Sequence, residues 1–419
     1  MATMEPDFAL ARSLFDALHR IGFDGVGMTR ASYDDGENRA HTLLADTARG
    51  LGLEIRTDWA ANLYMTLPGR DRLAPVVMTG SHVDTVPVGG NFDGAAGVVA
   101  GIALLAGWIR ADCQPVHDVT VMAIRAEESA WFPVSYIGSK AAFGLLDDAA
   151  LTVPQRDSGR PLAAHMAQAG GDPSNRATAA VLAPSAIDCF VELHIEQGPV
   201  LTETDMTLGI VTGICGSLRY REVVVHGRYA HSGATPRAYR QDAMAATARL
   251  IGMLEATWLA IEAEGEEMTL TFGVCRTDPR QSDFSTIAGR VDLSIDVRSR
   301  TPSILERMDR HIHTAVTAVE AEYGVRIDLG TLSGSTPASM DAGLQDDLTS
   351  LASELGFAAR SMPSGAGHDA ATFANQGVPT AMLFVRNANG SHNPDEAMDF
   401  QDFVQGTELL SALLWRRAG

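Results

Sequence analysis

The chain has 419 residues, of which 46% are hydrophobic and 20% charged, and its mean hydropathy is close to zero. This length allows two domains with separate cores, and the composition is that of an ordinary globular protein. The 32 basic and 52 acidic residues give a formal net charge of −20, which argues against nucleic acid or an anionic membrane surface as a partner. A negatively charged ligand would need local arginines or cations to bind.

Cysteine usage and the first residues bear on the cellular compartment. The four cysteines (Cys113, Cys189, Cys215 and Cys275) are widely separated and form no CxxC pair, as expected for reduced residues of a cytoplasmic protein. Residues 1–7 lack a basic segment and an apolar core, so we expect no signal peptide. The longest uncharged run, 94–109, is too short and too rich in glycine to span a bilayer and is expected to be a buried helix.

The first half of the chain alternates helices and strands. Apolar spacing predicts helices at 7–20 and 39–52, a helix at 94–110, and short strands at 53–57, 62–67, 76–82, 119–126 and 189–195. Such alternation favours an α/β domain built on a mostly parallel sheet, in which functional residues gather at the carboxyl ends of the strands. His82, Glu127, Glu128 and His194 all lie at predicted strand ends.

The pattern changes after about residue 212. Strands at 218–227, 269–276 and 290–298, helices at 240–264 and 302–323, and a strand at 325–330 follow the β-α-β-β-α-β order of a ferredoxin-like domain. Further on, a helix at 341–356, a strand at 378–385 and a helix at 399–417 are expected. We therefore predict one α/β domain formed by 1–212 and 331–419, into which a smaller domain, 213–330, is inserted.

Residues 76–94 contain the most informative motif. An apolar β-branched run ends in His82-Val83-Asp84, and a glycine-rich turn then leads to Asp93 before a helix of small residues. Because side chains two apart on a strand point to the same side, Asp84 can hold the far ring nitrogen of a metal-bound His82. Asp93 is placed where it could bridge two metal ions.

Potential metal ligands also follow other predicted strands. The candidates are His82, Asp93, Glu128, His194 and His392. Histidines combined with a bridging aspartate suit two borderline divalent ions such as zinc or manganese, which can activate water and polarise a carbonyl oxygen. Glu127 cannot point the same way as Glu128 at a strand end, so Glu128 is assigned as ligand and Glu127 as general base.

Each of these residues has a structural alternative when taken singly. A lone histidine is more often a surface residue or a hydrogen-bonded core residue than a ligand, and a Glu-Glu pair is more often a solvated strand edge. The combination of motifs at several strand ends is what indicates one shared site.

Several short stretches carry a family resemblance. They are Met28-Thr29-Arg30, residues 80–87, 90–94, Glu127-Glu128, Gly138-Ser139, 192–198, 231–236, 364–370 and Ser391-His392. Together they resemble the M20 metallopeptidase superfamily over nearly the whole chain. The string Glu-Leu-His-Ile-Glu-Gln-Gly at 192–198 resembles its hydantoinase/carbamoylase branch, which includes N-carbamoyl-L-amino acid hydrolases, β-ureidopropionases, allantoate amidohydrolases and ureidoglycolate amidohydrolases.

The resemblance implies roles for particular residues. It implies the five metal ligands named above with Asp93 bridging, and Glu127 as base. His231 would stabilise the oxyanion from the inserted domain of a partner subunit, and Arg298 would bind the substrate carboxylate. Without the resemblance, Arg298 reads as the exposed face of a strand. Gln197 and the Gly365–His368 loop would line the substrate pocket, and the inserted domain would act as lid and dimerisation domain of a homodimer.

The chain also departs from the family pattern. Ser285 stands where the family has an asparagine that contacts substrate, Ser217 where some members have glutamine, Trp131 where an arginine is common, and Arg237 where methionine is frequent. The expected metal ligands are unchanged, and the residues expected to face substrate are altered. A shorter Ser285 would remove a polar partner or leave room for a bulkier substrate side chain.

We therefore predict a cytoplasmic amidohydrolase with two divalent ions, acting on a small carboxylate-bearing substrate, most simply an N-carbamoyl-L-amino acid. Allantoate or ureidoglycolate hydrolysis and M20 exopeptidase activity are alternatives within the same chemistry. The alternative of another class is a metal-stabilised binding protein without catalysis. Such a protein is expected to have lost Glu127 or a ligand, and the sequence retains them all.

Overall fold

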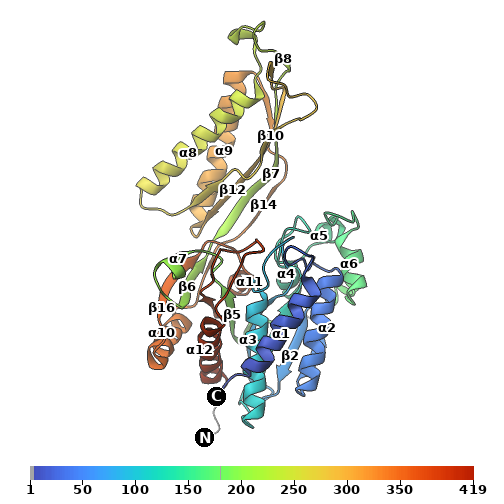
Figure 1. Cartoon of the computed structure of the whole chain (residues 1–419), viewed down its shortest axis with the longest axis vertical. Helices are drawn as coiled ribbons and strands as arrows, with labels where there is room; N and C mark the ends of the chain where they lie inside the picture. Colours follow the sequence, from blue (N-terminus) through green and yellow to red (C-terminus); the bar gives the residue numbers. More distant parts are fainter. Residues whose placement is uncertain (1–3, 180) are drawn as a thin grey trace. The chain divides into compact units, whose positions relative to one another are not determined.

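The chain forms two compact units (Figure 1), in a computed structural model that describes residues 4–179 and 181–419. One unit combines Met1–Gly213 with Ser339–Gly419, and the other is Ile214–Ala338. Each is described below by itself.

The first unit is built on a nine-stranded sheet with the order β1-β2-β4-β3-β5-β17-β6-β15, and β16 also pairs with β6. Its strands are β1 (Glu54–Thr57), β2 (Leu63–Leu67), β3 (Val76–His82), β4 (Val119–Ile124), β5 (Ile187–Ile195), β6 (Leu208–Ile214), β15 (Ala338–Ser339), β16 (Ala359–Ser364) and β17 (Thr380–Val385).

Parallel pairing is found at the centre of this sheet. Strands β4, β3, β5 and β17 run parallel, whereas β1, β2 and β6 join them antiparallel. The prediction of a mixed α/β fold is therefore confirmed, and the four central strands are parallel as expected, although β2 and β6 flank them with antiparallel pairing. Parallel neighbours need a crossover connection, and β1 and β2 are instead joined by a short turn that reverses the chain.

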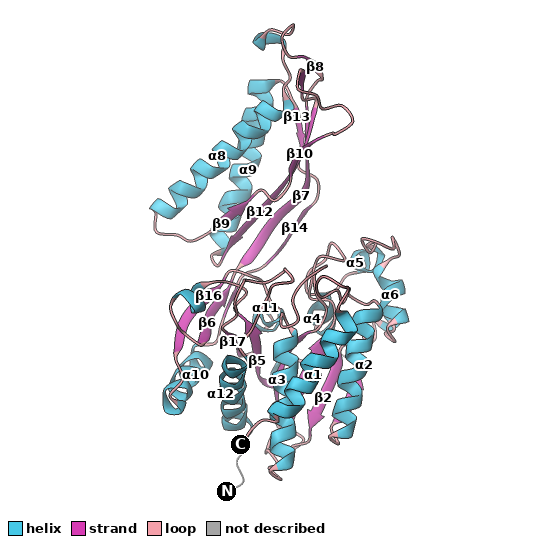
Figure 2. Cartoon of the chain, in the orientation of Figure 1, coloured by secondary structure: helices cyan, strands magenta, loops and turns pink. Residues whose placement is uncertain are grey.

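The helices of this unit, drawn in cyan in Figure 2, are α1 (Phe8–Gly22), α2 (Asp35–Gly50), α3 (Ala95–Arg110), α4 (Ile137–Ala142), α5 (Asp148–Thr152), α6 (Leu162–Gln168), α7 (Val200–Glu203), α10 (Ala342–Leu355), α11 (Asp369–Asn375) and α12 (Phe400–Ala418). The five long helices were predicted from apolar spacing. The others have four to seven residues, which is too short for a helical period to show in the sequence.

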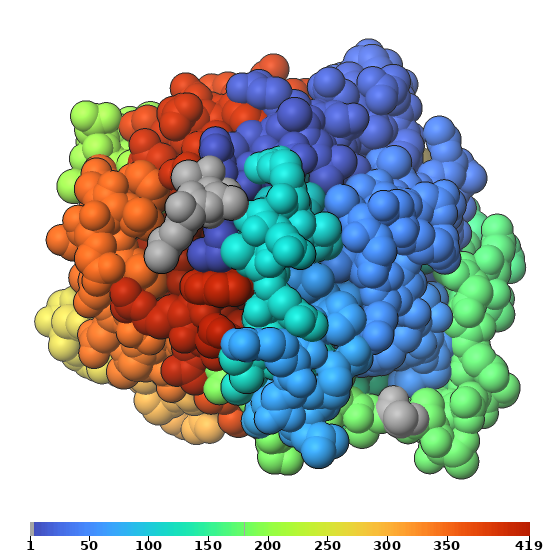
Figure 3. Space-filling view, turned by 90° about the horizontal axis from the view of Figure 1, so that it is seen from below, coloured from blue at the N-terminus to red at the C-terminus, as the bar shows by residue number. Residues whose placement is uncertain are grey.

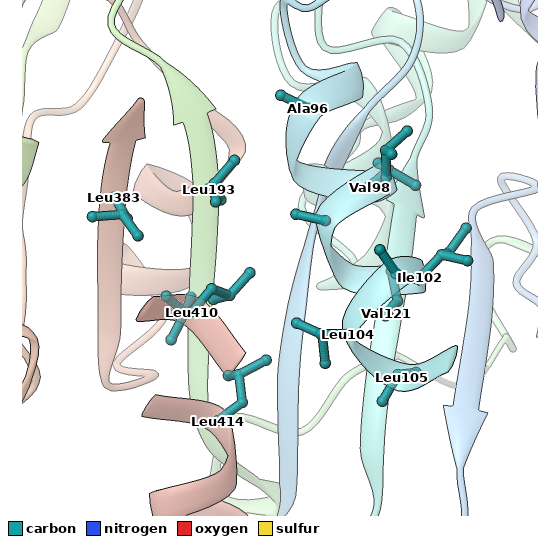
Figure 4. Close-up of a cluster of buried hydrophobic side chains, with 14 of the residues drawn as sticks. Ala96, Val98, Ile102, Leu104, Leu105, Val121, Leu193, Leu383, Leu410 and Leu414 are labelled. Carbon is teal, nitrogen blue, oxygen red and sulfur yellow. The ribbon is translucent and has the colours of Figure 1, made fainter. Parts of the chain in front are cut away.

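The main core lies between the sheet and helices α3 and α12 (Figure 4). Almost every residue of α3 from Ala95 to Trp108 is buried, as predicted for the long uncharged run. Along β5, Val191 and Leu193 join this core, so the alternating Glu192 and His194 face the other side of the sheet. This alternation places polar side chains away from the core.

The end of the chain is fixed against the same unit. The backbone N–H groups of Val116 and His117 donate to the carbonyl oxygen of Ala418. On the face drawn in Figure 3, the red end of the chain lies beside the blue N-terminal part and the cyan region that follows α3. These hydrogen bonds join the end of α12 to the segment that precedes β4.

The second unit contains β7 (Gly216–His226), α8 (Ala243–Ala263), β9 (Thr269–Thr271), β10 (Cys275–Thr277), β12 (Arg290–Ser299), α9 (Pro302–Tyr323), β13 (Arg326–Asp328) and β14 (Leu332–Ser335), with a small pair β8 (Ala230–His231) and β11 (Thr286–Ile287). Its sheet has the order β10-β12-β7-β13. The helices and strands come in the expected β-α-β-β-α-β order, with β14 added, and the strand expected at 269–276 is divided into β9 and β10.

One face of this second sheet is covered by its two helices. Residues alternate between buried and partly exposed along β12, and the buried ones pack with Leu250 and Leu254 of α8 and with Met308 and Ile312 of α9. Among the described residues, α8 alone has the length and apolar composition of a possible membrane span. A helix that packs on a sheet can have the same length and apolar composition, and α8 contributes buried residues to this core.

Candidate metal centre

Four chain segments converge at the carboxyl edge of the parallel strands. His82 is the last residue of β3, Glu127 and Glu128 follow β4, His194 lies at the end of β5, and the loop after β17 carries His392. Neighbouring parallel strands end at the same edge of a sheet, which is why residues separate in sequence meet here.

Asp93 lies between two groups of side chains. Its Oδ1 is 3.6 Å from His82 Nε2 and 3.2 Å from His194 Nε2. Its Oδ2 is 3.4 Å from His392 Nε2, which is also 3.4 Å from Glu128 Oε1. In each group the three potential ligand atoms lie within 4.8 Å of one another. The two oxygens of one carboxylate thus serve two separate clusters of metal-ligating atoms.

The ring orientations of the buried histidines suit metal binding. His82 Nδ1 is 3.1 Å from the carbonyl oxygen of Asp84 and 3.2 Å from its carboxylate, and His194 Nδ1 is 2.9 Å from the carbonyl oxygen of Ile195. Oxygen atoms at this distance accept a hydrogen bond, so Nδ1 carries the proton in each ring. Nε2 is then the ring atom that faces Asp93 in both histidines, the atom through which such an imidazole ligates a metal.

A glycine makes room for this arrangement. Gly94 precedes α3 with φ of +65°, and a Cβ atom there would lie 2.4 Å from His82 Nε2. A side chain at residue 94 would therefore collide with the imidazole and also strain the left-handed backbone. The sequence Asp93-Gly94 brings Asp93 next to the histidines because the glycine occupies so little space.

Asp84 connects His82 with the Glu127-Glu128 pair. Its Oδ1 and Oδ2 accept the backbone N–H groups of Glu127 and Glu128 at 3.1 and 3.2 Å, and Ser32 Oγ donates to Oδ2 at 2.6 Å. Glu127 Oε2 lies 4.0 Å from His82 Nε2. Asp84 therefore holds both an imidazole and the backbone that carries two carboxylates.

The crowding of carboxylates shifts their acidities. Burial raises the pKa of Glu127 well above its ordinary value, although the nearby His82 opposes the shift. Burial likewise raises the pKa of Glu128. For Asp93 burial is outweighed by the hydrogen bonds and charges of His194, His392 and His82, which hold its pKa well below the usual range. Three imidazoles and buried carboxylates form a set of ligands that fits borderline divalent cations.

The residues expected to line a substrate pocket in this unit lie next to the cluster. Gln197 Nε2 donates to Asp93 Oδ2 at 2.7 Å. The loop Gly365–His368 brings the His368 ring to 4.5 Å from that of His194, and His368 Nε2 is 3.0 Å from Ser364 Oγ. Gln197 and His368 are thus in contact with Asp93 and His194, two of the potential metal ligands.

The structure adds residues that sequence reasoning missed. Ser391 Oγ donates to Asp93 Oδ2 at 2.6 Å, and Glu396 Oε1 accepts the backbone N–H of Phe92 at 2.8 Å. Ser391 adjoins His392, so its position in the motif was a usable signal. Nothing in the local sequence distinguishes Glu396 from a solvated acid.

The remaining predicted site residues belong to the second unit. His231 is exposed on β8, and its Nδ1 accepts the N–H groups of Gly233 and Ala234 at 3.1 and 3.2 Å. The carbonyl oxygen of Ser285 accepts the N–H of Ser232. Arg298, on β12, donates to Asp296 at 3.1 and 3.3 Å.

Two departures from the family pattern have structural roles. Trp131 is buried and donates through Nε1 to the carbonyl oxygen of Thr85 at 2.6 Å. Its indole packs in a hydrophobic cluster with Trp59, Phe132 and Ile137, so Trp131 is a core residue in this structure. Ser217 Oγ lies 3.1 Å from Ser335 Oγ across neighbouring strands.

Comparison with known proteins gives consistent matches. The sequence profile of peptidase family M20/M25/M40 matches residues 78–416. The chain is 34% identical to an N-carbamoyl-L-amino acid amidohydrolase of Geobacillus stearothermophilus, over 94% of each chain. It is 33% identical to the allantoate amidohydrolase of Escherichia coli, over 96% of each chain.

Solved structures agree with these matches. An amidase of the hydantoinase/carbamoylase family from Burkholderia multivorans superposes with a TM-score of 0.85 at 26% identity, covering 99% of both chains. One from Burkholderia ambifaria has a TM-score of 0.81 at 31% identity and covers 99% of this chain and 98% of that one. The chain therefore belongs to the M20/M25/M40 peptidase family and, within it, to the hydantoinase/carbamoylase amidases, which are hydrolases of C–N bonds.

Proposed function

We propose that the protein uses two divalent cations to hydrolyse the ureido C–N bond of N-carbamoyl-L-amino acids. Several similar proteins bear the name N-carbamoyl-L-amino acid amidohydrolase. The observation that carries the proposal is the division of Asp93, whose two oxygens each face a separate cluster of potential ligands.

His82, Asp93 and His194 would hold one cation, and Asp93, Glu128 and His392 the other. Zinc and manganese match this mixture of imidazole and carboxylate ligands. Bound there, two such ions would lower the pKa of a water molecule and polarise the substrate carbonyl. Because every ligand must be deprotonated, we expect cation binding to weaken as the pH falls.

Glu127 is the proposed general base. It adjoins the proposed ligand Glu128, lies close to His82 and is absent from both ligand clusters. A buried carboxylate with a raised pKa accepts a proton more readily than an exposed one. In the proposed reaction Glu127 takes a proton from the attacking water and passes it to the leaving nitrogen. The bond between the carbonyl carbon and the amino-acid nitrogen breaks and releases the free amino acid and carbamate, which decomposes to ammonia and carbon dioxide.

His231 and Arg298 are proposed to act on the substrate from the second unit. Because His231 Nδ1 accepts two backbone N–H groups, its neutral ring carries the proton on Nε2, where it can be donated to an oxyanion. Arg298 has a planar guanidinium suited to a substrate carboxylate. Ser285 lies beside His231 and is proposed to leave space for the substrate side chain. We further propose that this unit acts as lid and dimerisation domain of a cytoplasmic homodimer.

The second candidate is hydrolysis of allantoate, because proteins of that name match almost as well as the carbamoylases. Both reactions cleave a linear ureido bond next to a carboxylate, so the metal clusters and Glu127 do not separate them. Discrimination between the two substrates must come from residues such as Ser285 and Ser217, which differ from the family pattern.

The test is ammonia release by metal-loaded protein. The substrates are N-carbamoyl-L-amino acids, allantoate and ureidoglycolate, with release of amino acids from dipeptides measured alongside. Glu127→Gln is the inactive variant, and Glu354→Gln, an exposed residue of α10, is the matched control. Turnover of carbamoyl compounds that is lost only in Glu127→Gln supports the proposal. Turnover of allantoate alone would show that allantoate, and not an N-carbamoyl-L-amino acid, is the substrate. No turnover with both cations bound would favour a binding protein.

A further inference from the structure

The backbone that carries Glu127 and Glu128 is held by side chains beyond the end of the sheet. The pairing of β4 ends at Ala123 and Ile124. In the next four residues each N–H donates to a side-chain oxygen: Arg125 to Asn62 Oδ1 at 2.9 Å, Ala126 to Glu37 Oε1 at 2.9 Å, and Glu127 and Glu128 to Asp84. Side chains, rather than a neighbouring strand, therefore fix the path of this segment.

Ala126 adopts an unusual conformation within this segment. Its φ is +52°, a left-handed value that residues with a Cβ atom rarely adopt. Such a conformation persists only where the surroundings impose it. Here the N–H of Ala126 is bound by Glu37, and its carbonyl oxygen accepts the N–H of Ile137. The turn at Ala126 sets the direction in which residues 127 and 128 leave the strand.

Glu37 is a buried carboxylate with three donors. It lies on α2 and has no exposed surface. Its Oε1 accepts the N–H of Ala126, and its Oε2 accepts the N–H of Tyr33 at 2.5 Å and Arg125 Nη1 at 3.0 Å. Leaving a charge in a core is costly unless it is paired and hydrogen-bonded, and this one meets both conditions. Glu37 belongs to neither of the Asp93 ligand clusters.

We propose that Glu37 is a positioning residue that fixes the backbone at Ala126 and thereby directs Glu127 towards the reacting water and Glu128 towards its cation. This proposal rests on the proposed function for the roles of Glu127 and Glu128. It assigns a task to an acid far from them in sequence, which reaches the reaction only through the main chain.

Two conservative variants distinguish the effect of the length of the Glu37 side chain from the effect of its charge. Glu37→Gln keeps the length of the side chain, but its amide group confronts Arg125 and the N–H of Tyr33 with a further donor. Glu37→Asp keeps the charge beside Arg125 but withdraws the oxygen from Ala126. The matched control is Asp188→Asn. Asp188 pairs with Arg417 at 2.9 and 3.0 Å near the amino end of β5, far from the carboxyl edge that holds the cluster.

The measurements combine kinetics with two readouts that need no turnover. They are kcat and KM with an N-carbamoyl-L-amino acid, binding of Mn²⁺ to the metal-free protein by calorimetry, and amide hydrogen exchange of the peptide that covers 125–128. We expect both Glu37 variants to lower kcat at least tenfold with KM changed less than threefold. They should also speed exchange at 126–128 and weaken Mn²⁺ binding. Asp188→Asn should lower thermal stability without these changes.

A further variant tests the mechanism at Ala126. Glycine adopts a positive φ without strain, so Ala126→Gly in the Glu37→Asp background should recover part of kcat. A kcat within twofold of wild type in both Glu37 variants, or a fall that Asp188→Asn reproduces, would overturn the proposal. If wild-type protein cleaves no ureido compound, the proposed function fails, and the exchange and Mn²⁺ measurements still decide the role of Glu37. Unaltered exchange and Mn²⁺ affinity would then reject it.

Discussion

The carboxylate of Asp84 accepts the backbone N–H of Glu127 at 3.1 Å. The same Oδ1 atom lies 3.2 Å from His82 Nδ1, so one oxygen connects the imidazole proposed as a ligand with the backbone of the proposed base. Asp84 is thus more than the partner of a single histidine. Its position couples the end of β3 to the segment after β4.

Replacing Asp84 should therefore damage two features together. In Asp84→Asn one carboxylate oxygen is replaced by an NH2 group, so either the N–H of Glu127 or that of Glu128 loses its acceptor. Substitutions of residues that hold metal ligands typically cost about 10–100-fold in metal affinity or activity, and we expect a loss at the upper end of that range. Zinc affinity and kcat are to be measured together. Loss of kcat with unchanged zinc affinity would show that the backbone contact alone matters.

Removing the proposed base should affect chemistry and spare binding. Glu127→Gln keeps the size of the side chain but removes its ability to accept a proton, and general bases contribute roughly 10²–10⁴-fold to rate. We expect kcat to fall by about this factor while KM and the content of two cations per chain stay near the wild-type values. A variant that also loses a cation would identify Glu127 as a ligand instead.

The local motifs of the site could be predicted from sequence, and its supporting contacts could not. The spacing of His82, Asp84 and Asp93 follows from strand alternation and a glycine turn, so it is visible locally. Glu37 lies in a helix between other polar residues and reads as a solvated acid. Only the packing of α2 against the segment after β4 makes it a buried partner of Ala126.

The same distinction applies to the fold. Long helices such as α1 show their apolar period in sequence, whereas the direction of a strand depends on the connection that precedes it. The antiparallel pairing of β6 with β17 has no local sequence signal. The burial of Trp131 could not be predicted, because an aromatic residue near Glu-Glu can face either a ligand or the core, and only tertiary structure decides.

The space around Gly94 leads to a steric prediction. Gly94→Ala places a methyl group 2.4 Å from His82 Nε2 and requires φ of +65° for alanine. Overpacking of this kind costs about 1–3 kcal/mol, and the displaced imidazole should lower zinc affinity as well. The control is Gly252→Ala, in the interior of α8, where an added Cβ meets nothing within 4 Å. That change should stabilise the protein by up to about 1 kcal/mol, as measured by urea unfolding.

Removal of the cations should lower the stability of the folded protein. A ligand that binds only the folded state stabilises it by about 2.7 kcal/mol at a hundred times its dissociation constant. Treatment with a chelator should therefore lower the melting temperature, and excess Zn²⁺ or Mn²⁺ should restore it. In His392→Ala we expect a smaller shift, because the cluster of His82, Asp93 and His194 remains. Equal shifts in the two proteins would argue against a second cation.

The buried Asp369 should make the stability of the metal-free protein depend on pH. Burial, together with the charge of Glu192, raises the pKa of Asp369 to about 8. Ser139 Oγ donates to its Oδ1 at 2.6 Å, and Oδ2 is buried without a hydrogen bond to any described residue. Between the ordinary pKa of an aspartate, near 4, and the raised one, the folded state holds a proton that the unfolded state releases. Stability should therefore fall as the pH rises through this window.

Asp369→Asn isolates this contribution, because asparagine stays neutral and similar in shape. Other buried acids, such as Glu192, have raised pKa values as well, so the informative quantity is the difference between the two proteins. We expect the free energy of unfolding of metal-free wild type, measured in urea between pH 5.5 and 8.5, to decrease more steeply than that of Asp369→Asn. Asp35→Asn, an exposed change on α2, should follow wild type. Parallel profiles for wild type and Asp369→Asn would show that Asp369 is already ionised in the folded protein throughout this range.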